Sequence, residues 1–150
     1  MKRIVLPIMA LLLIVACDKN ETDTDVTSAD LETIRSTAAS GSWRVSYYYD
    51  SDKDETSDYA GYTFTFGNDG VLSATDGTTS LSGAWSVTDS DSNDDDGNDD
   101  IDFNIVFTGS ELFEELSDDW DIVKYSDSKI ELFDVSGGDG TTDYLTFEKL

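Results

Sequence analysis

Apolar residues are distributed in three different ways along the chain. Residues 4–16 form an almost unbroken apolar run after the basic start Met1-Lys2-Arg3. Residues 18–28 contain one apolar residue and no periodicity, so they are predicted to be a disordered tether. From Gly41 onward, apolar and polar residues alternate in short segments separated by turn residues, which is typical of β-strands. The pattern predicts an export segment, a tether and one β domain.

Eight segments of the β domain have the alternation of strands with one buried face. In the clearest, Ile101–Thr108, Ile, Phe, Ile and Phe occupy every second position. Gly67-Asn68-Asp69-Gly70 predicts a hairpin turn, because glycine and asparagine tolerate positive φ. The predicted strands are Trp43–Tyr49, Tyr62–Phe66, Val71–Thr75, Leu81–Thr88, Ile101–Thr108, Trp120–Tyr125, Lys129–Phe133 and Asp143–Lys149.

Two short helices accompany these strands. Asp30–Ala39 is predicted to be a helix capped by Asp30, and Ser110–Ser117 a helical connection. Eight short antiparallel strands suit a sandwich or a closed barrel, and closure removes exposed strand edges. The predicted fold is all-β, an eight-stranded antiparallel up-and-down barrel with a short N-terminal helix. Such a barrel encloses just enough space for side chains or for one small ligand.

The end of the apolar run indicates how the protein is exported. The run is shorter than the roughly 20 residues that span a bilayer, and its basic start is typical of a secretory signal. Ile14-Val15-Ala16-Cys17 resembles the lipobox of bacterial lipoproteins. The resemblance implies cleavage before Cys17 and a diacylglyceryl group on its sulfur, whereas a buried cysteine in an anchor helix is the alternative. The predicted regions are a signal peptide (1–16), a lipid-anchored acidic tether (17–29) and the barrel domain (30–150).

The charge restricts the partners of the protein. The whole chain carries a net charge of −24, and removal of Lys2 and Arg3 with the signal peptide would make it −26. Such a protein repels nucleic acid and anionic headgroups, so the lipid is expected to hold it on the membrane. The acids after Cys17 also resemble the export signals of surface lipoproteins in the Bacteroidota. The predicted location is the cell envelope, at the outer membrane, with the periplasmic or external face left open.

A second resemblance concerns the first strand. Gly41-Ser42-Trp43 resembles the G-x-W signature of lipocalins, and the strings GSWRVSYYYD, YTFTFGNDGVLSAT, GAWSVT and YLTFEKL are similar to lipocalin-like domains of small Bacteroidota lipoproteins. This resemblance covers most of residues 41–150. It implies that Trp43 plugs the closed end of the barrel, with a basic residue near the last strand, here Lys149, packed over it. Gly83-Ala84-Trp85 repeats the element, so Trp43 and Trp85 are expected to be core anchors.

The chain has few of the residues and motifs that enzymes use for catalysis. There is no histidine, and Cys17 is the only cysteine, so Ser-His-Asp and Cys-His systems and imidazole metal sites are excluded. The glycine motifs of hydrolases and nucleotide-binding proteins are missing. Glu114 and Glu115 are helix neighbours that point in different directions. The protein is therefore predicted not to be an enzyme, and no cofactor besides the covalent lipid is expected.

One acidic segment could hold an ion. Residues 89–100 contain seven aspartates, and oxygen ligands at this density suit Ca²⁺. With Gly97 at the sixth position of an EF-hand loop, Ser92 would be first and Phe103 twelfth, so that pattern fails. A solvated hairpin loop is the favoured interpretation. The candidate metal ligands are Asp91, Asp94, Asp95 and Asp96.

Two functions stay open on sequence grounds. In the first, the barrel binds a small apolar or amphipathic ligand, and the bulky residues predicted on inner faces form its wall. In the second, the barrel is filled, and the protein is a surface interaction or structural lipoprotein. The large number of Trp, Phe and Tyr residues favours a filled barrel. The candidate ligand-binding residues are Tyr47, Tyr49, Tyr62 and Phe64.

Overall fold

A computed structural model describes residues 26–90, 100–135 and 140–150 of the chain. Its helical elements are η1 (Ser28–Asp30), α1 (Leu31–Ala39), η2 (Thr56–Tyr59) and α2 (Glu111–Glu114). None of the helices among these residues is long and apolar enough to cross a membrane. Its strands are β1 (Trp43–Asp50), β2 (Lys53–Asp54), β3 (Thr63–Phe66), β4 (Val71–Thr75), β5 (Ser80–Ser90), β6 (Asp100–Phe107), β7 (Asp118–Ser126), β8 (Lys129–Val135) and β9 (Thr142–Lys149).

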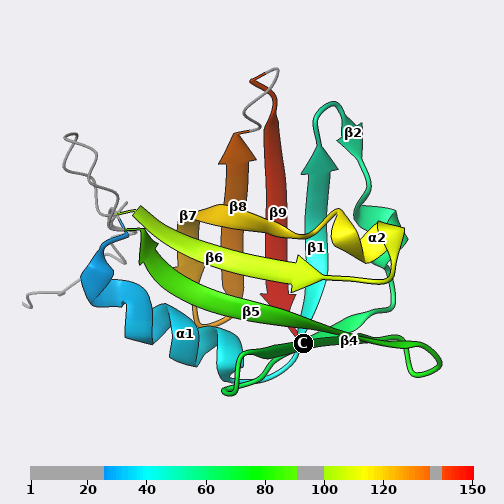
Figure 1. Cartoon of the computed structure of the whole chain (residues 1–150), viewed down its shortest axis with the longest axis horizontal. Helices are drawn as coiled ribbons and strands as arrows, with labels where there is room; N and C mark the ends of the chain where they lie inside the picture. The colour runs from blue at the N-terminus through cyan, green and yellow to red at the C-terminus, as the bar shows by residue number, and fades with distance from the viewer. Residues whose placement is uncertain (1–25, 91–99, 136–139) are drawn as a thin grey trace, which may run out of the picture.

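The strands form a closed, all-antiparallel barrel in which neighbours in sequence are neighbours in space (Figure 1). β3 to β9 follow one another in order, and β1 closes the barrel by pairing with β9 along most of its length. On its other side, β1 pairs with β3 at its first residue, Trp43, and with the two-residue strand β2 at its last residues. The predicted eight-stranded barrel with a short N-terminal helix is confirmed, and β2 is an unpredicted addition to it.

The interior is filled with aromatic side chains. Phe66 lies at the centre of this packing, with ring centroids 5.2 Å from Trp85, 5.4 Å from Phe103 and 5.3 Å from Phe147, all in edge-to-face geometry. Such contacts add about 0.5–1.5 kcal/mol each to the hydrophobic gain of burial. The alternation in the sequence predicts that Phe66, Trp85 and Phe103 point inward, as they do, so a period of two residues determines most of the core.

Helices close the barrel at two places (Figure 1). Ile34 and Ala38 of α1 are fully buried in the core, and the carbonyl of Ala38 accepts a hydrogen bond from Trp43 Nε1 at 2.8 Å. On the other side, Phe113 of α2 packs edge-to-face on Tyr59. The phenol of Tyr59 donates to the carbonyl of Leu112 at 2.7 Å. Each helix is therefore held by an apolar side chain and by a backbone carbonyl, α1 against Trp43 of β1 and the core, and α2 against Tyr59 of η2.

The prediction that Asp30 caps α1 is wrong. Asp30 precedes the helix with helical backbone angles and makes no capping hydrogen bond to it. The 3₁₀ turn η1 starts the helical segment earlier, so the Asp30 carboxylate accepts from the backbone N–H of Thr27 at 3.0 Å and from the hydroxyl of Tyr125 at 2.9 Å. These hydrogen bonds, first that from Thr27, lower the pKa of Asp30. The hydrogen bond from Tyr125 attaches the start of the helical segment to β7.

The inward direction predicted for Tyr47 is also wrong. The register of β1 against β9 shifts between Val45 and Tyr47, where Ser46 is the extra residue of a β-bulge. Beyond the bulge, the faces exchange: Tyr48 is 2% exposed and Tyr47 is 40% exposed. Tyr49, whose ring stacks on that of Tyr47, shares its outer side. One inserted residue therefore reverses the direction of every later side chain of the strand.

Candidate functional site: a groove on the outer surface of the barrel

The four predicted wall residues do not lie together. Tyr47 and Tyr49 lie outside the barrel, with ring centroids 6.2 Å apart and an interplanar angle of 14°. Phe64 is fully buried, and half-buried Tyr62 packs edge-to-face on Phe113. The structure therefore does not form the predicted ligand wall inside the barrel.

The two predicted core anchors, Trp43 and Trp85, are buried, and the indole N–H of each donates a hydrogen bond to a backbone carbonyl outside its own strand. Trp43 is 0% and Trp85 is 6% exposed. Trp85 Nε1 donates to the carbonyl of Gly67 in the turn between β3 and β4, at 2.9 Å. The ammonium of Lys149 lies 5.3 Å from the centre of the Trp43 ring, a cation–π geometry, and donates to the hydroxyl of Ser40. Lys149 therefore packs over Trp43, as expected from the sequence.

Two other predicted sites fall outside the described residues. Cys17 precedes residue 26, the first residue that the structure describes. The candidate calcium ligands Asp91, Asp94, Asp95 and Asp96 lie in the stretch between residues 90 and 100. Both interpretations stay predictions.

A groove of about 600 Å³ crosses the outer surface of β8, β9 and β1 and ends against η2. This volume is in the range of about 300–1,000 Å³ that small-molecule sites occupy. The groove exists because the bulge in β1 turns Tyr47 outward and because η2 covers the place where β1 and β3 diverge. Its lining residues are Arg44, Val45, Ser46, Tyr47, Thr56, Ser57, Tyr59, Ala60, Gly61, Lys129, Glu131, Thr146 and Glu148.

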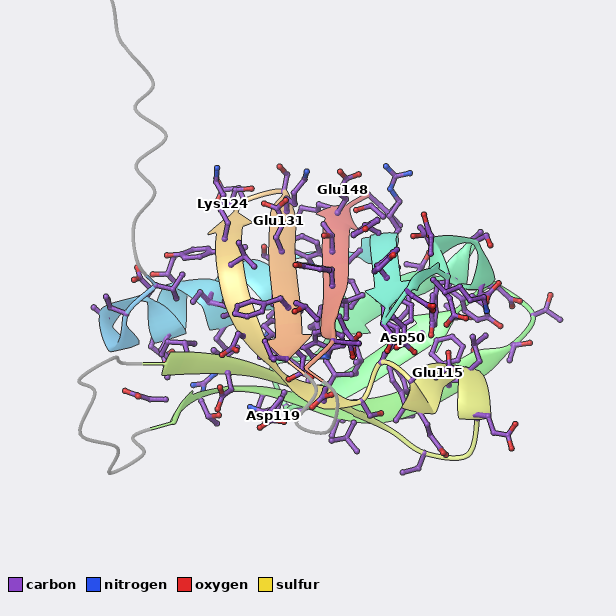
Figure 2. All side chains as sticks on the ribbon, turned by 90° about the horizontal axis from the view of Figure 1, so that it is seen from above. Asp50, Glu115, Asp119, Lys124, Glu131 and Glu148 are labelled. Atoms are coloured by element: carbon purple, nitrogen blue, oxygen red, sulfur yellow. The ribbon has the colours of Figure 1, made fainter. Side chains whose placement is uncertain are left out.

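Charged side chains in the groove are paired with one another. Arg44 Nη2 lies 2.7 Å from Glu148 Oε2, Lys129 Nζ lies 3.7 Å from Glu148 Oε1, and Lys129 Nζ lies 4.0 Å from Glu131 Oε1. The hydrogen bond from Arg44 lowers the pKa of Glu148. Figure 2 shows Glu131 and Glu148 projecting from the outside of the barrel. Two cations and two carboxylates therefore give this part of the surface no net charge.

Tyrosines at the η2 end of the groove are held as hydrogen-bond donors. Burial raises the pKa of Tyr59, and its phenol donates to the Leu112 carbonyl. Burial, with a smaller contribution from Asp50, also raises the pKa of Tyr48, whose phenol donates to the carbonyl of Glu115 at 2.9 Å. Both phenols stay protonated at neutral pH, so neither can act as a general base there.

Acidic side chains near the groove repel one another rather than form a cation site. Loss of hydration, and next the charge of Glu55, raises the pKa of Glu115; Asp50, which also raises it, lies at the same end of the barrel in Figure 2. Away from the groove, where Figure 2 shows Asp119, loss of hydration raises the pKa of Asp118 to about 6, with a hydrogen bond to Asp119 contributing. Among the described residues, no three Asp, Glu, His or Cys side chains are grouped to hold a metal ion.

The charged residues of the groove were missed by sequence reasoning. Arg44 and Glu148 are outward positions on the first and last strands, and they meet only because closure of the barrel pairs β1 with β9. A search for charge pairs between the terminal strands of a predicted barrel could have found them. Lys129 and Glu131 on β8 then complete the row.

The comparisons with known proteins agree with the fold. No family model matches the chain, and no curated protein matches it. A solved structure, that of a DUF4847 family protein from Bacteroides vulgatus, is similar, with a TM-score of 0.50 and 18% sequence identity. The match covers 78% of this chain and 97% of that protein. At this identity, the similarity concerns the fold of the barrel.

Proposed function

We propose that the protein is a non-catalytic, lipid-anchored protein of the bacterial cell envelope that binds its ligand on the outside of a filled barrel. The observation that carries the proposal is the contrast between interior and surface. Aromatic rings fill the core, whereas a groove of about 600 Å³ lies outside across β8, β9 and β1. Of the two functions left open by the sequence, this contrast favours the interaction lipoprotein over a carrier of apolar molecules.

An apolar ligand inside the barrel would have to displace packed side chains. Phe64 contacts both Phe113 and Phe147, with ring centroids 6.0 and 5.4 Å apart. Removal of a ring from such a core costs about 3–5 kcal/mol. A ligand that pushed one aside would have to replace that stabilisation in full. Binding on the outer surface needs no such rearrangement.

The groove suits a polar ligand without net charge. Each of its cations, Arg44 and Lys129, has a carboxylate partner, so neither is available to an anion without breaking a pair. The net charge of −24 also repels anionic molecules. The exposed ring of Tyr47 offers a flat surface beside these pairs, on which the apolar face of a polar molecule can rest. A neutral or zwitterionic ligand satisfies all of these conditions.

The anchor and the absence of catalysis rest on sequence. Cys17 ends the apolar run, and the acidic residues after it would separate the barrel from the membrane surface. Two acyl chains give stable anchoring where one is marginal. The lack of histidine supports a binding role rather than catalysis. The anchor is tested by Cys17→Ser, which should abolish metabolic palmitate labelling and detergent partitioning; a variant still lipidated would contradict it.

Native mass spectrometry of protein purified from its own host tests where the ligand binds. We expect a polar small molecule to accompany the wild-type protein and to be lost from Arg44→Glu, which would place three carboxylates in the groove. Thr78→Ala, an exposed change in the hairpin between β4 and β5 and outside the groove, is the control and should keep the ligand. If the Arg44→Glu variant retained the ligand, the groove would not be the binding site.

A neutral apolar dye, N-phenyl-1-naphthylamine, tests the interior. We expect no saturable rise in its fluorescence with the folded protein, because the core is filled. Saturable binding of one dye per chain would favour the carrier function instead.

A further inference from the structure

The outer surface of β3 to β6 carries almost no charge, although charged residues make up 28% of the chain. Its central strand is β5, whose outward residues are Ser80, Ser82, Ala84, Ser86 and Thr88. The residues that pair with these five on β4 and β6 are Ser, Thr, Val and Asn, with Asp102 at one corner as the exception. We call this surface of β3, β4, β5 and β6 the uncharged face.

An apolar row crosses the middle of the uncharged face. Val71 pairs with Ala84, and Ala84 pairs with Val106, so the three side chains lie side by side on adjacent strands. Val71 is 43% and Val106 is 51% exposed, and Ala84 is exposed as well. Exposed apolar residues grouped in this way and surrounded by polar ones have the anatomy of an interface centre.

Hydroxyl groups border this apolar row on one side. Thr65 pairs with Ser73, and Ser73 pairs with Ser82, which gives a second row across three strands. A hydroxyl group both donates and accepts hydrogen bonds. A surface of hydroxyls is therefore complementary to a copy of itself, whereas a surface of carboxylates repels its own copy.

The charge of the protein decides which surfaces of two copies can meet. On the opposite side of the barrel from β5 and β6, Lys124, Glu131 and Glu148 project into solvent (Figure 2). Most contacts between two chains of net charge −24 bring like charges together and are unfavourable. The uncharged face avoids this repulsion, and its apolar row gives a reason to associate.

We propose that the uncharged face is where two copies of this chain associate as a two-fold homodimer. In such an isologous contact, the apolar row of one copy lies against that of the other, with hydroxyl groups around it. The proposal is independent of the groove on β8, β9 and β1. If each copy is also lipid-anchored, confinement to one membrane raises the effective concentration of its partner.

The size of the face predicts a weak dimer. The strands β3, β4, β5 and β6 have 4, 5, 11 and 8 residues, which at about 3.3 Å per residue and about 4.8 Å per strand give an area of roughly 440 Å². Two such faces bury ~900 Å², in the range of weak, transient contacts and below that of stable interfaces. The dimer should therefore exchange with monomer rather than be permanent, and a covalent trap is the suitable assay.

Site-specific cross-linking of the full chain in cells tests the proposal. Cys17 is the only native cysteine and is the predicted lipid site, so a new cysteine on the face is the thiol that a bismaleimide reaches. We expect Ser82→Cys, Ala84→Cys or Ser86→Cys to give a band of twice the monomer mass. Ser126→Cys on β7 and the wild-type chain are the controls and should stay monomeric.

A second change in the same chain tests whether the face itself makes the contact. Val71→Glu added to Ala84→Cys places like charges across the two-fold axis and should lower the cross-linked fraction by about tenfold or more. Circular dichroism checks that this exposed substitution leaves the barrel folded. Failure of all three cysteines to cross-link would overturn the proposal, as would a cross-link to a different protein or an equal band from Ser126→Cys. Loss of groove binding would not affect this result.

Discussion

β1 and β5 share the pattern Gly-x-Trp-x-Val but differ in the residues that come after it. In both strands the tryptophan and the valine point into the core, and the indole N–H donates to a carbonyl of another segment. β5 then keeps a regular alternation, and its outer residues are small and uncharged. β1 instead has the bulge at Ser46, carries Arg44 on its outer side and joins the charged row of β8 and β9.

This difference shows that packing in the core determines only the inward-facing residues of a strand. A tryptophan that fills the interior suits either strand, because the interior is shared. The outward-facing residues depend on the position of the strand in the barrel. β1 has to close against β9, and the bulge accommodates the change of register between these two strands. Substitutions on the two strands and on the surfaces beside them should separate these contributions, and the core positions should have the largest effect.

Among the substitutions considered on β1 and β5, those of Trp43 and Trp85 should lower the stability most, and by similar amounts. Trp43→Ala and Trp85→Ala should each lower the free energy of unfolding by about 3–5 kcal/mol, since each leaves a large cavity. Trp43→Ala should cost more, because Trp43 is 0% exposed, against 6% for Trp85, and also holds the end of α1 through Ala38. Urea unfolding measures both. A loss under about 1 kcal/mol at both sites would contradict their role as core anchors.

Gly83 should be required in β5 because of close packing. A Cβ there would lie 2.4 Å from the carbonyl oxygen of Val106, which is backbone and cannot turn away. Gly83→Ala should therefore destabilise the fold by about 1–3 kcal/mol. Gly41, the matching glycine before β1, is needed for its φ of 133° instead, and its added Cβ would meet only the end of Lys149. Ser82→Ala, an outward change beside Gly83, is the control and should change stability by less than about 0.5 kcal/mol.

Titration should reveal a set of acidic side chains outside the groove. The pKa of Asp118 is raised to about 6, and the pKa values of Asp134 and Glu115 are raised as well, so these groups bind protons more tightly in the folded state. The folded state then holds more protons than the unfolded state between pH 4 and about 6, and stability rises as the pH falls from 7 toward about 5. Below pH 4 the trend should reverse, because the lowered pKa values of Asp30 and Glu148 reflect interactions that protonation removes.

Calorimetry between pH 3.5 and 8 measures this dependence. Asp118→Asn should raise the melting temperature at pH 7.5 and flatten the rise toward pH 5, because it removes the carboxylate with the largest upward shift. A melting temperature that falls steadily from pH 7.5 to pH 5 would contradict the assignment.

The exposed ion pair of β1 should have the smallest effect. Arg44→Gln breaks its pair with Glu148, but the Arg44 side chain is 57% exposed, so the loss should be under about 1 kcal/mol and should shrink further in salt. Chemical denaturation at two salt concentrations measures it. A loss above about 2 kcal/mol would mean that the charged row stabilises the barrel and is more than a binding surface.

Much of the fold could be predicted from the sequence because burial in a strand repeats every two residues. Phe103 and Ile105 of β6 are inward as predicted, and Trp43 and Lys149 take the places expected from the lipocalin resemblance. The inward direction of Tyr47 was predicted wrongly, because the alternation carries no mark of an inserted residue. The helix cap failed for a similar reason: the 3₁₀ turn before α1 moved Asp30 into the helical segment.

The sequence by itself determined the predicted strands, the residues that fill the core and the absence of histidine chemistry. These depend on composition and on a local period, which are the same whatever a strand pairs with. Tertiary structure decided the surfaces. Side chains of β1 and η2 form one groove with those of β8 and β9 only because β1 closes against β9, and the uncharged rows exist only in the register that aligns Val71, Ala84 and Val106. Long-range pairing sets this register, since every inward side chain must find its place in the same filled core.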